Sequence, residues 1–252
     1  MKRLLLLITI FTFSFSSISY ADENPFNTAI AYYNQGKYQQ AIKYFTKSAN
    51  RGSSTAQFNL GLMYSKGQGV KQDHTKALKW YKKAAKNGHV AAQVNLAQMY
   101  RKGQGTNQDS YKAFKWYKEA AEQGHASAQY SLYFRYYYGD GVKEDNSKAM
   151  KWLKKSANQG YVKAQYELGT NVYLFPKDTK QEQANYQAFE WMKKAAEQGY
   201  DSAQLKLGLM YEDGIGIKKD YTQALKWYKK AAEQGHARAI VRAKKLQLKI
   251  KH

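Results

Sequence analysis

Apolar and polar positions alternate in a regular pattern that predicts pairs of helices. In the unit that begins at Gly88, the apolar residues Ala92, Leu96 and Tyr100 are four residues apart and so share one helix face. A Gly-x-Gly turn follows, and Asp109 stands where it can cap a second helix. That second helix carries apolar residues around a tryptophan and ends at a glycine suited to a left-handed C-cap.

The same unit recurs along the chain with a nearly constant period. The five tryptophans are separated by 36, 36, 39 and 36 residues, and glycines keep the same spacing. One helix pair cannot bury its own apolar face, whereas stacked pairs bury a continuous core. The pattern therefore predicts an all-α fold, namely an α-solenoid of helix-turn-helix repeats. The tryptophans are Trp80, Trp116, Trp152, Trp191 and Trp227.

The period divides the chain into segments. Five units occupy residues 52–234, with boundaries at 52–87, 88–123, 124–159, 160–198 and 199–234. Residues 22–51 form a shorter opening hairpin, and residues 235–252 are expected to form a basic C-terminal cap helix without a partner helix. Unit 160–198 is three residues longer, and Pro176 is expected to end its first helix early. Two explanations of the insertion at 174–187 are equally good: it accommodates a bound partner, or it records drift of the repeat sequence.

The units resemble the Sel-one-like repeat family, relatives of the tetratricopeptide repeats. Residues 56–88, AQFNLGLMYSKGQGVKQDHTKALKWYKKAAKNG, carry the resemblance, which extends over 52–234. The opening hairpin is more similar to a plain tetratricopeptide hairpin. The resemblance implies a right-handed superhelical scaffold or adaptor that binds proteins through its concave face. For an exported bacterial member, it also implies envelope regulation, peptidoglycan-linked processes or host interaction.

The first 21 residues have the pattern of a secretory signal peptide. Lys2 and Arg3 precede a largely apolar run over residues 4–18, and residues 19 and 21 are small enough for a cleavage site. The run is shorter than the roughly 20 residues that cross a bilayer as a helix. We therefore expect residues 1–21 to be removed, and the protein to be exported, either periplasmic or secreted.

Comparison of the units predicts a partner-binding surface in the middle of the array. Positions that hold alanine, glutamine, leucine and tyrosine barely change between units and are expected to pack. Other positions of the first helices vary and are expected to line the groove, where tyrosine and arginine are typical of binding hot spots. The alternative is that these rings fill gaps between repeats. The candidate contacts are Gln98, Arg101, Tyr130, Phe134, Tyr137, Tyr138, Tyr166 and Tyr173.

Three neighbours of these tyrosines occupy notable positions. Tyr136 stands at a fixed packing position and is expected in the core. Tyr133 stands where the other units have glycine or alanine, so its ring is expected to push a neighbour away or to point outward. Arg135 replaces a residue that is methionine in three units.

The chain has a formal net charge of +22, which favours anionic partners through attraction and counterion release. Lysines recur beside the tryptophans, so we expect most of this charge on the exposed convex face. The basic C-terminal segment has an amphipathic pattern suited to an anionic envelope surface. Nucleic acid is a poor partner for an exported protein, and the sequence does not indicate an oligomeric state.

Patterns for catalysis and for metal binding are weak. The absence of cysteine excludes disulfides, thiolate zinc sites and cysteine nucleophiles. His89, His125 and His236 are at least one repeat apart, too far for one zinc ion, and are expected to start helices. Ser127 and Ser131 have no histidine and carboxylate arranged by sequence to activate them.

The prediction from the sequence is therefore a non-catalytic adaptor that uses no cofactor and binds a protein or peptide. Two alternatives stay open. One is a cell-wall hydrolase of the β-lactamase kind, although the Ser-x-x-Lys and Lys-Thr-Gly motifs are missing. The other is a salt-sensitive binder of anionic envelope polymer.

Overall fold

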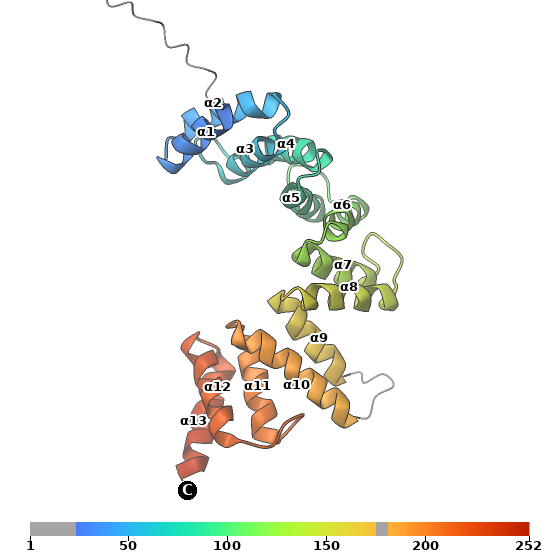
Figure 1. The fold of residues 1–252 in the computed structure, drawn as a ribbon, viewed down its shortest axis with the longest axis vertical. Coiled ribbons are helices and arrows are strands. Elements are labelled where there is room, and N and C mark those ends of the chain that lie inside the picture. Colours follow the sequence, from blue (N-terminus) through green and yellow to red (C-terminus); the bar gives the residue numbers. More distant parts are fainter. Residues whose placement is uncertain (1–23, 175–180, 252) are drawn as a thin grey trace, which may run out of the picture.

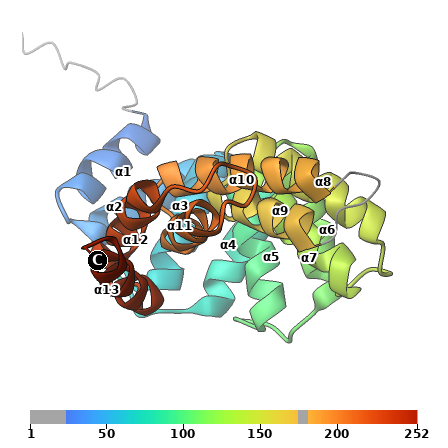
Figure 2. The same cartoon turned by 90° about the horizontal axis from the view of Figure 1, so that it is seen from below.

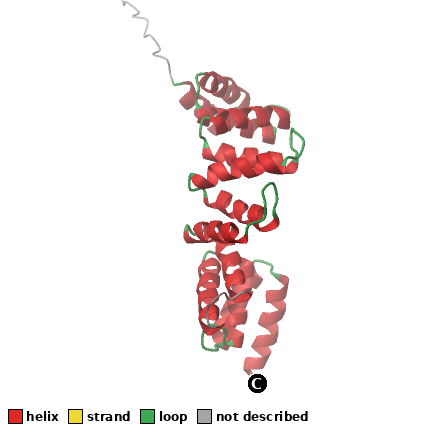
Figure 3. Cartoon of the chain, turned by 90° about the vertical axis from the view of Figure 1, so that its right-hand side faces the viewer, coloured by secondary structure: helices red, strands yellow, loops and turns green. Residues whose placement is uncertain are grey.

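The computed structural model describes residues 24–174 and 181–251, and this part of the chain contains thirteen helices and no strand. Consecutive helices pair and stack along an elongated array (Figure 1), with short loops between them (Figure 3). Seen along its long axis, the array curls (Figure 2). The predicted all-α solenoid is confirmed. The predicted signal peptide and Pro176 lie outside the described residues.

Each repeat consists of an A helix followed by a B helix. The A helices are α3 (Ser54–Lys66), α5 (Val90–Lys102), α7 (Ala126–Tyr138), α9 (Val162–Leu174) and α11 (Asp201–Asp213). The B helices are α4 (His74–Lys86), α6 (Ser110–Glu122), α8 (Asn146–Asn158), α10 (Gln181–Glu197) and α12 (Tyr221–Glu233). The pair α1 (Pro25–Asn34) and α2 (Tyr38–Asn50) opens the array, and α13 (Ala237–Lys251) closes it.

Side chains cap the helices at their N-termini as the pattern predicts. Asp109 accepts a 2.8 Å hydrogen bond from the Lys112 N–H and satisfies one free donor of α6. His89 and His125 each accept an N–H bond through Nδ1 at the start of α5 and α7. Their predicted role as helix-start residues is confirmed.

The second glycine of each Gly-x-Gly turn is required by packing as well as by its backbone angles. Gly105 has φ +70°, and a Cβ there would collide with the carbonyl group of His74 in the preceding B helix. Gly141 meets Ser110 in the same way. The turns therefore press directly against the neighbouring repeat, which a side chain would prevent.

A buried glutamine near the start of each A helix connects three helix ends. Gln129 Nε2 donates to the Ala121 carbonyl at the end of α6, at 3.1 Å, and its Oε1 accepts from Gln159 Nε2 at 2.6 Å. The Ala121 carbonyl, which also accepts from the Gly124 N–H at 3.0 Å, thereby gains a second donor from the next repeat. The expected packing role is confirmed, with hydrogen bonding added. The equivalent residues, all buried, are Gln57, Gln93, Gln165 and Gln204.

The irregular repeat 160–198 differs mainly in its second helix. The early end expected before Pro176 is wrong, because α9 has 13 residues, like the other A helices. The steric effect of a proline acts on the residue just before it, which here lies beyond Leu174. Instead, α10 has 17 residues and is the longest of the B helices.

Candidate partner-binding site

Five rings on α7 form one continuous group, which we call the α7 aromatic cluster. Phe134 is at its centre, with ring centroids 5.0 Å from Tyr130, 4.8 Å from Tyr133 and 6.0 Å from Tyr138. Tyr137 and Tyr138 meet edge to face at 4.9 Å. Tyr138 is 69% exposed and Tyr137 is 36% exposed, whereas Tyr130 and Phe134 are half-buried. The predicted contacts on α7 therefore lie together, with two rings at the surface.

Tyr133 does not point outward, so the second of the two expected outcomes for this ring is wrong. The ring is buried, and its hydroxyl donates to Glu167 Oε1 at 3.2 Å and accepts from Asn171 Nδ2 at 3.4 Å, both on α9. Burial raises the pKa of Tyr133. The partner position on α8 is Leu153, where the preceding repeat has Tyr117, so a smaller side chain leaves room for the ring.

The half-buried rings also pack between repeats. Tyr130 contacts Tyr161, the first residue before the next A helix, with centroids 5.4 Å apart. Tyr166 contacts Tyr200 in the same way at 5.2 Å, and Phe58 stacks on His89 at 4.5 Å. The pairing therefore belongs to the repeat architecture, and it extends the aromatic surface from α7 toward α11.

The other predicted contacts lie apart from the cluster or cannot be placed. Gln98 and Arg101 are exposed on α5, in the preceding repeat. Burial raises the pKa of Tyr117, and the positive charge of Arg101 opposes this rise. The side chain of Tyr173 is outside the described part of the chain.

Several residues next to the α7 aromatic cluster have structural roles, and comparison of the repeat sequences predicted only some of them. Tyr136 is buried and meets Phe114 edge to face at 5.5 Å, so its predicted core position is confirmed. Arg135 is buried, pairs with Asp140 and lies 5.6 Å from the Tyr117 ring. Tyr161 and Tyr200 were not predicted as part of this surface, although each stands where other units have histidine.

The lysines of the B helices lie over the tryptophans. The Nζ atoms of Lys83 and Lys155 are 4.5 and 4.6 Å from the ring centroids of Trp80 and Trp152. The same arrangement recurs in two further repeats, at 4.4 and 4.5 Å. These distances suit cation–π attraction, so one lysine in each of four repeats covers the tryptophan ring.

One serine–histidine contact arises that the sequence did not indicate. Ser127 Oγ lies 3.2 Å from His125 Nδ1, but this nitrogen also accepts the Ala128 N–H as a helix cap. In the part of the chain that the structure describes, no three His, Cys, Asp or Glu side chains gather to hold a metal ion. Over the same residues, no helix is long and apolar enough to cross a bilayer.

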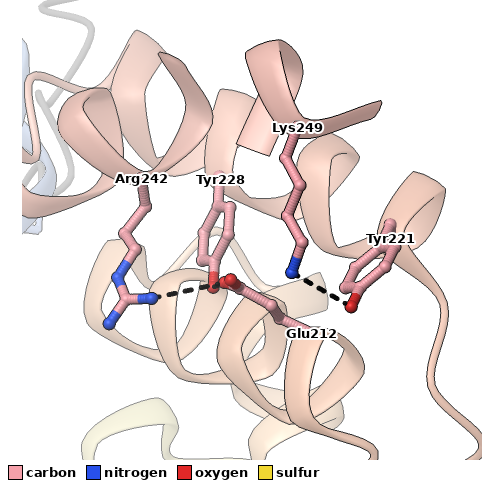
Figure 4. Close-up of polar contacts among 5 residues, drawn as sticks. All are labelled: Glu212, Tyr221, Tyr228, Arg242 and Lys249. Carbon is pink, nitrogen blue, oxygen red and sulfur yellow. Dashed lines mark hydrogen bonds and ion pairs between the residues drawn. The ribbon is translucent and has the colours of Figure 1, made fainter. Parts of the chain in front are cut away.

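Polar contacts fasten the terminal helix to the last repeat. Glu212 on α11 accepts a 2.5 Å bond from the Tyr228 hydroxyl and lies 3.5 Å from Arg242 of α13 (Figure 4). Lys249 donates to the Tyr221 hydroxyl at 3.2 Å. Burial and the adjacent carboxylate both raise the pKa of Tyr228. This group therefore stabilises the end of the array.

Known proteins share this fold along most of the chain. The fold matches the crystal structure of a protective antigen present in uropathogenic Escherichia coli strains, which displays an SLR fold. The TM-score is 0.80, with 37% identity, covering 87% of this chain and 47% of that chain. This chain thus spans about half of that protein. No curated protein matches.

Two other crystal structures give a similar result. A Sel1 repeat protein from Oxalobacter formigenes is 32% identical, with a TM-score of 0.76, covering 87% of this chain and 86% of that one. An immunity protein from Pseudomonas aeruginosa is 21% identical, with a TM-score of 0.52 over 82% of this chain and 81% of its own, and shares the fold.

The sequence model described as Sel1 repeat matches six times, at residues 26–53, 54–89, 90–125, 126–161, 162–200 and 201–236. The opening hairpin, which resembled a plain tetratricopeptide hairpin, is thus matched as well. The matches include both helices of each pair from α1 to α12. The chain therefore belongs to the Sel1 repeat family.

Proposed function

We propose that this protein is a non-catalytic adaptor that holds a protein or peptide partner against the A helices, on the concave face. The α7 aromatic cluster carries this proposal. Its exposed tyrosines, Tyr137 and Tyr138, rest on a half-buried Phe134 and a buried Tyr133, so they are held in place before a partner arrives. Rigid aromatic anchors lose little conformational entropy on binding.

The test begins with purification of partners on the immobilised protein from envelope extracts at low and moderate salt. The affinity of the identified partner is then measured for the double variant Tyr137→Ala/Tyr138→Ala. We expect a loss of about 30-fold or more, because each ring is placed as a hot-spot residue. The matched control is Tyr111→Ala/Tyr186→Ala, which removes two tyrosines that are 60% and 55% exposed outside the cluster. Equal losses in both variants would contradict the proposal.

We also propose that the protein is exported after removal of residues 1–21, on the strength of the charged start, apolar run and small residues there. N-terminal sequencing of the protein from a periplasmic or culture fraction tests this. A mature N-terminus at Asp22 is expected. An intact Met1 in the cytoplasmic fraction would contradict it.

A second candidate function rests on α13. This helix exposes Val241 and Leu248, which are 66% and 62% exposed, beside the exposed cations Arg238, Lys244 and Lys245. Such a face suits an anionic envelope surface. This candidate would be favoured if the protein binds anionic polymer, if the affinity falls steeply with added salt, and if the Tyr137→Ala/Tyr138→Ala variant binds equally well.

A further inference from the structure

In three repeats, a tyrosine of the B helix fills a space beside the A helix. Tyr81 and Tyr228 lie against Gly61 and Gly208, and a Cβ on either glycine would be 2.6 Å from the ring. Both rings are buried. Tyr117 occupies the same position opposite Ala97. The small residue on one helix and the ring on the other therefore form one packing unit.

The tyrosine hydroxyls of these units reach one particular position of the A helix. Tyr81 Oη lies 3.4 Å from Ser65 Oγ, and Tyr228 Oη donates to Glu212 at 2.5 Å (Figure 4). Ser65 and Glu212 correspond, within the repeat, to Tyr137 of the α7 aromatic cluster. The ring therefore lies beneath the surface that carries the candidate partner contacts.

The repeat 160–198 lacks such a ring. It has Met192 at the tyrosine position and Gly169 opposite. In repeat 124–159, which also lacks the tyrosine, Tyr133 supplies a ring from the A helix. In repeat 160–198 the flexible Met192 side chain takes the place of the ring, and its Cε would be 3.1 Å from a Cβ on Gly169. A cavity of about 160 Å³ opens beside these residues and Ala188, between α9, α10 and α11.

The residues that line this cavity indicate which chemical group it can bind. Leu209, Met210 and Ile215 form its apolar wall, while the exposed Lys206 and Asp213 line it with charge. An apolar cavity of about 150 Å³ holds a molecule of the size of benzene. The cavity is therefore large enough for one aromatic ring or one branched aliphatic side chain. Charges of both signs beside it suit the carbonyl and N–H groups of a peptide backbone.

We infer that this cavity is an anchor pocket for a single phenylalanine or leucine side chain of a bound peptide. The inference rests on the proposed adaptor function and adds a specificity site to it. Thr170, in the pocket lining, lies one turn after Tyr166 and donates to its carbonyl at 3.0 Å. Because Tyr166 packs on Tyr200, the pocket adjoins the aromatic surface that begins at α7.

The test uses the full chain with ¹³C-methyl-labelled methionine, titrated with N-acetyl-phenylalanine amide and N-acetyl-leucine amide. We expect saturable shifts of the Met192 and Met210 methyl signals, while Met63 and Met99, buried in other repeats, stay unchanged. N-acetyl-alanine amide, which cannot fill the cavity, should cause no shift. Absence of saturable shifts with the two larger amides would overturn the inference.

Met192→Tyr is the matched variant, because it reproduces the Gly61/Tyr81 and Gly208/Tyr228 pairs and fills the cavity with a fold-compatible ring. The Met210 shift should disappear in this variant, and affinity for an identified partner should fall about tenfold or more. Met192→Phe provides the ring without the hydroxyl if the tyrosine variant does not fold. A Met210 shift that persists in a folded, filled variant would overturn the pocket.

The amide titration needs no partner, so its result separates the pocket from the adaptor function. If the amides bind in the pocket but the partner is insensitive both to Met192→Tyr and to Tyr137→Ala/Tyr138→Ala, the adaptor proposal fails and the anchor role fails with it. If only the amides fail to bind, the anchor pocket is overturned and the tyrosine surface stands.

Discussion

At the scale of single residues, the large side chain that fills the space between the two helices of a repeat can come from either helix. The pair Ala97 and Tyr117 places the ring on the B helix, whereas Tyr133 and Leu153 place it on the A helix one repeat later. All four side chains are buried, so the space between helices is filled in either arrangement. A position that looks anomalous in one helix is therefore explained by its partner in the other.

Because one large side chain is needed at this position, we expect the effects of substitutions at residues 133 and 153 on the free energy of unfolding to be coupled favourably. Tyr133→Ala should lower the free energy of unfolding by about 3–5 kcal/mol through the cavity it leaves, and Leu153→Tyr should lower it by about 1–3 kcal/mol through overpacking. The double variant reproduces the Ala97/Tyr117 pair and should recover about 1–3 kcal/mol of the summed loss. Urea unfolding of all four proteins measures this coupling. Strictly additive losses would contradict it.

The buried glutamines support a second residue-scale prediction. Gln129→Ala removes the side-chain donor to the buried Ala121 carbonyl, which keeps its bond from the Gly124 N–H, and also removes the acceptor of the Gln159 amide. The loss of these two hydrogen bonds should cost about 1–2 kcal/mol of unfolding free energy in urea denaturation. The exposed Gln108 provides the control, since Gln108→Ala should change stability by less than about 0.5 kcal/mol. Similar losses in the two variants would mean that the hydrogen bonds at Gln129 contribute little.

At the scale of helices, the capping aspartates link stability to pH. The pKa values of Asp73 and Asp145 are lowered, mainly because the backbone N–H groups of Lys76 and Lys148 donate to them. A carboxyl with a lowered pKa stabilises the fold above its unfolded pKa of about 3.9, and this contribution is lost as the pH falls through the lower folded value.

The variant Asp73→Asn/Asp145→Asn keeps an oxygen acceptor at both caps but removes the titration. We expect its melting temperature to fall less steeply than that of the original protein between about pH 5 and about pH 2. Thermal melts followed by circular dichroism across this range measure the two slopes. Parallel curves would show that these caps do not contribute to the acid dependence.

The helices could be predicted from sequence because their signals are local. The spacing of Ala92, Leu96 and Tyr100, the cap at Asp109 and the left-handed C-cap at Gly103 depend on neighbours within one repeat. The candidate site was only partly predictable, because contacts such as Tyr130 with Tyr161 and Tyr133 with Glu167 join residues more than 30 positions apart. For Tyr133 the pattern left two orientations open, because the choice between them depends on the size of Leu153 in another helix.

At the scale of the whole molecule, each repeat packs mainly on its neighbours along the array. The terminal helix α13 covers the last B helix, and its Ala239, Ala243 and Leu246 join a buried group with Tyr228 and Ala231. In such a quasi-one-dimensional structure, stability is close to a sum of repeat and interface contributions, and the ends need a cap. A defect in α13 should therefore loosen the end of the array before its middle.

The leucines of α13 allow this to be tested within one helix. Leu246 is 1% exposed and Leu248 is 62% exposed. Leu246→Ala should remove about 2–5 kcal/mol from the stability of the terminal interface, whereas Leu248→Ala should be nearly neutral. Native-state hydrogen exchange should show lost protection in α11–α13 of the first variant, with α3–α6 unchanged. If protection fell equally in α3–α6, the array would unfold as one cooperative unit, and a partner bound at α7 would then be coupled to both ends.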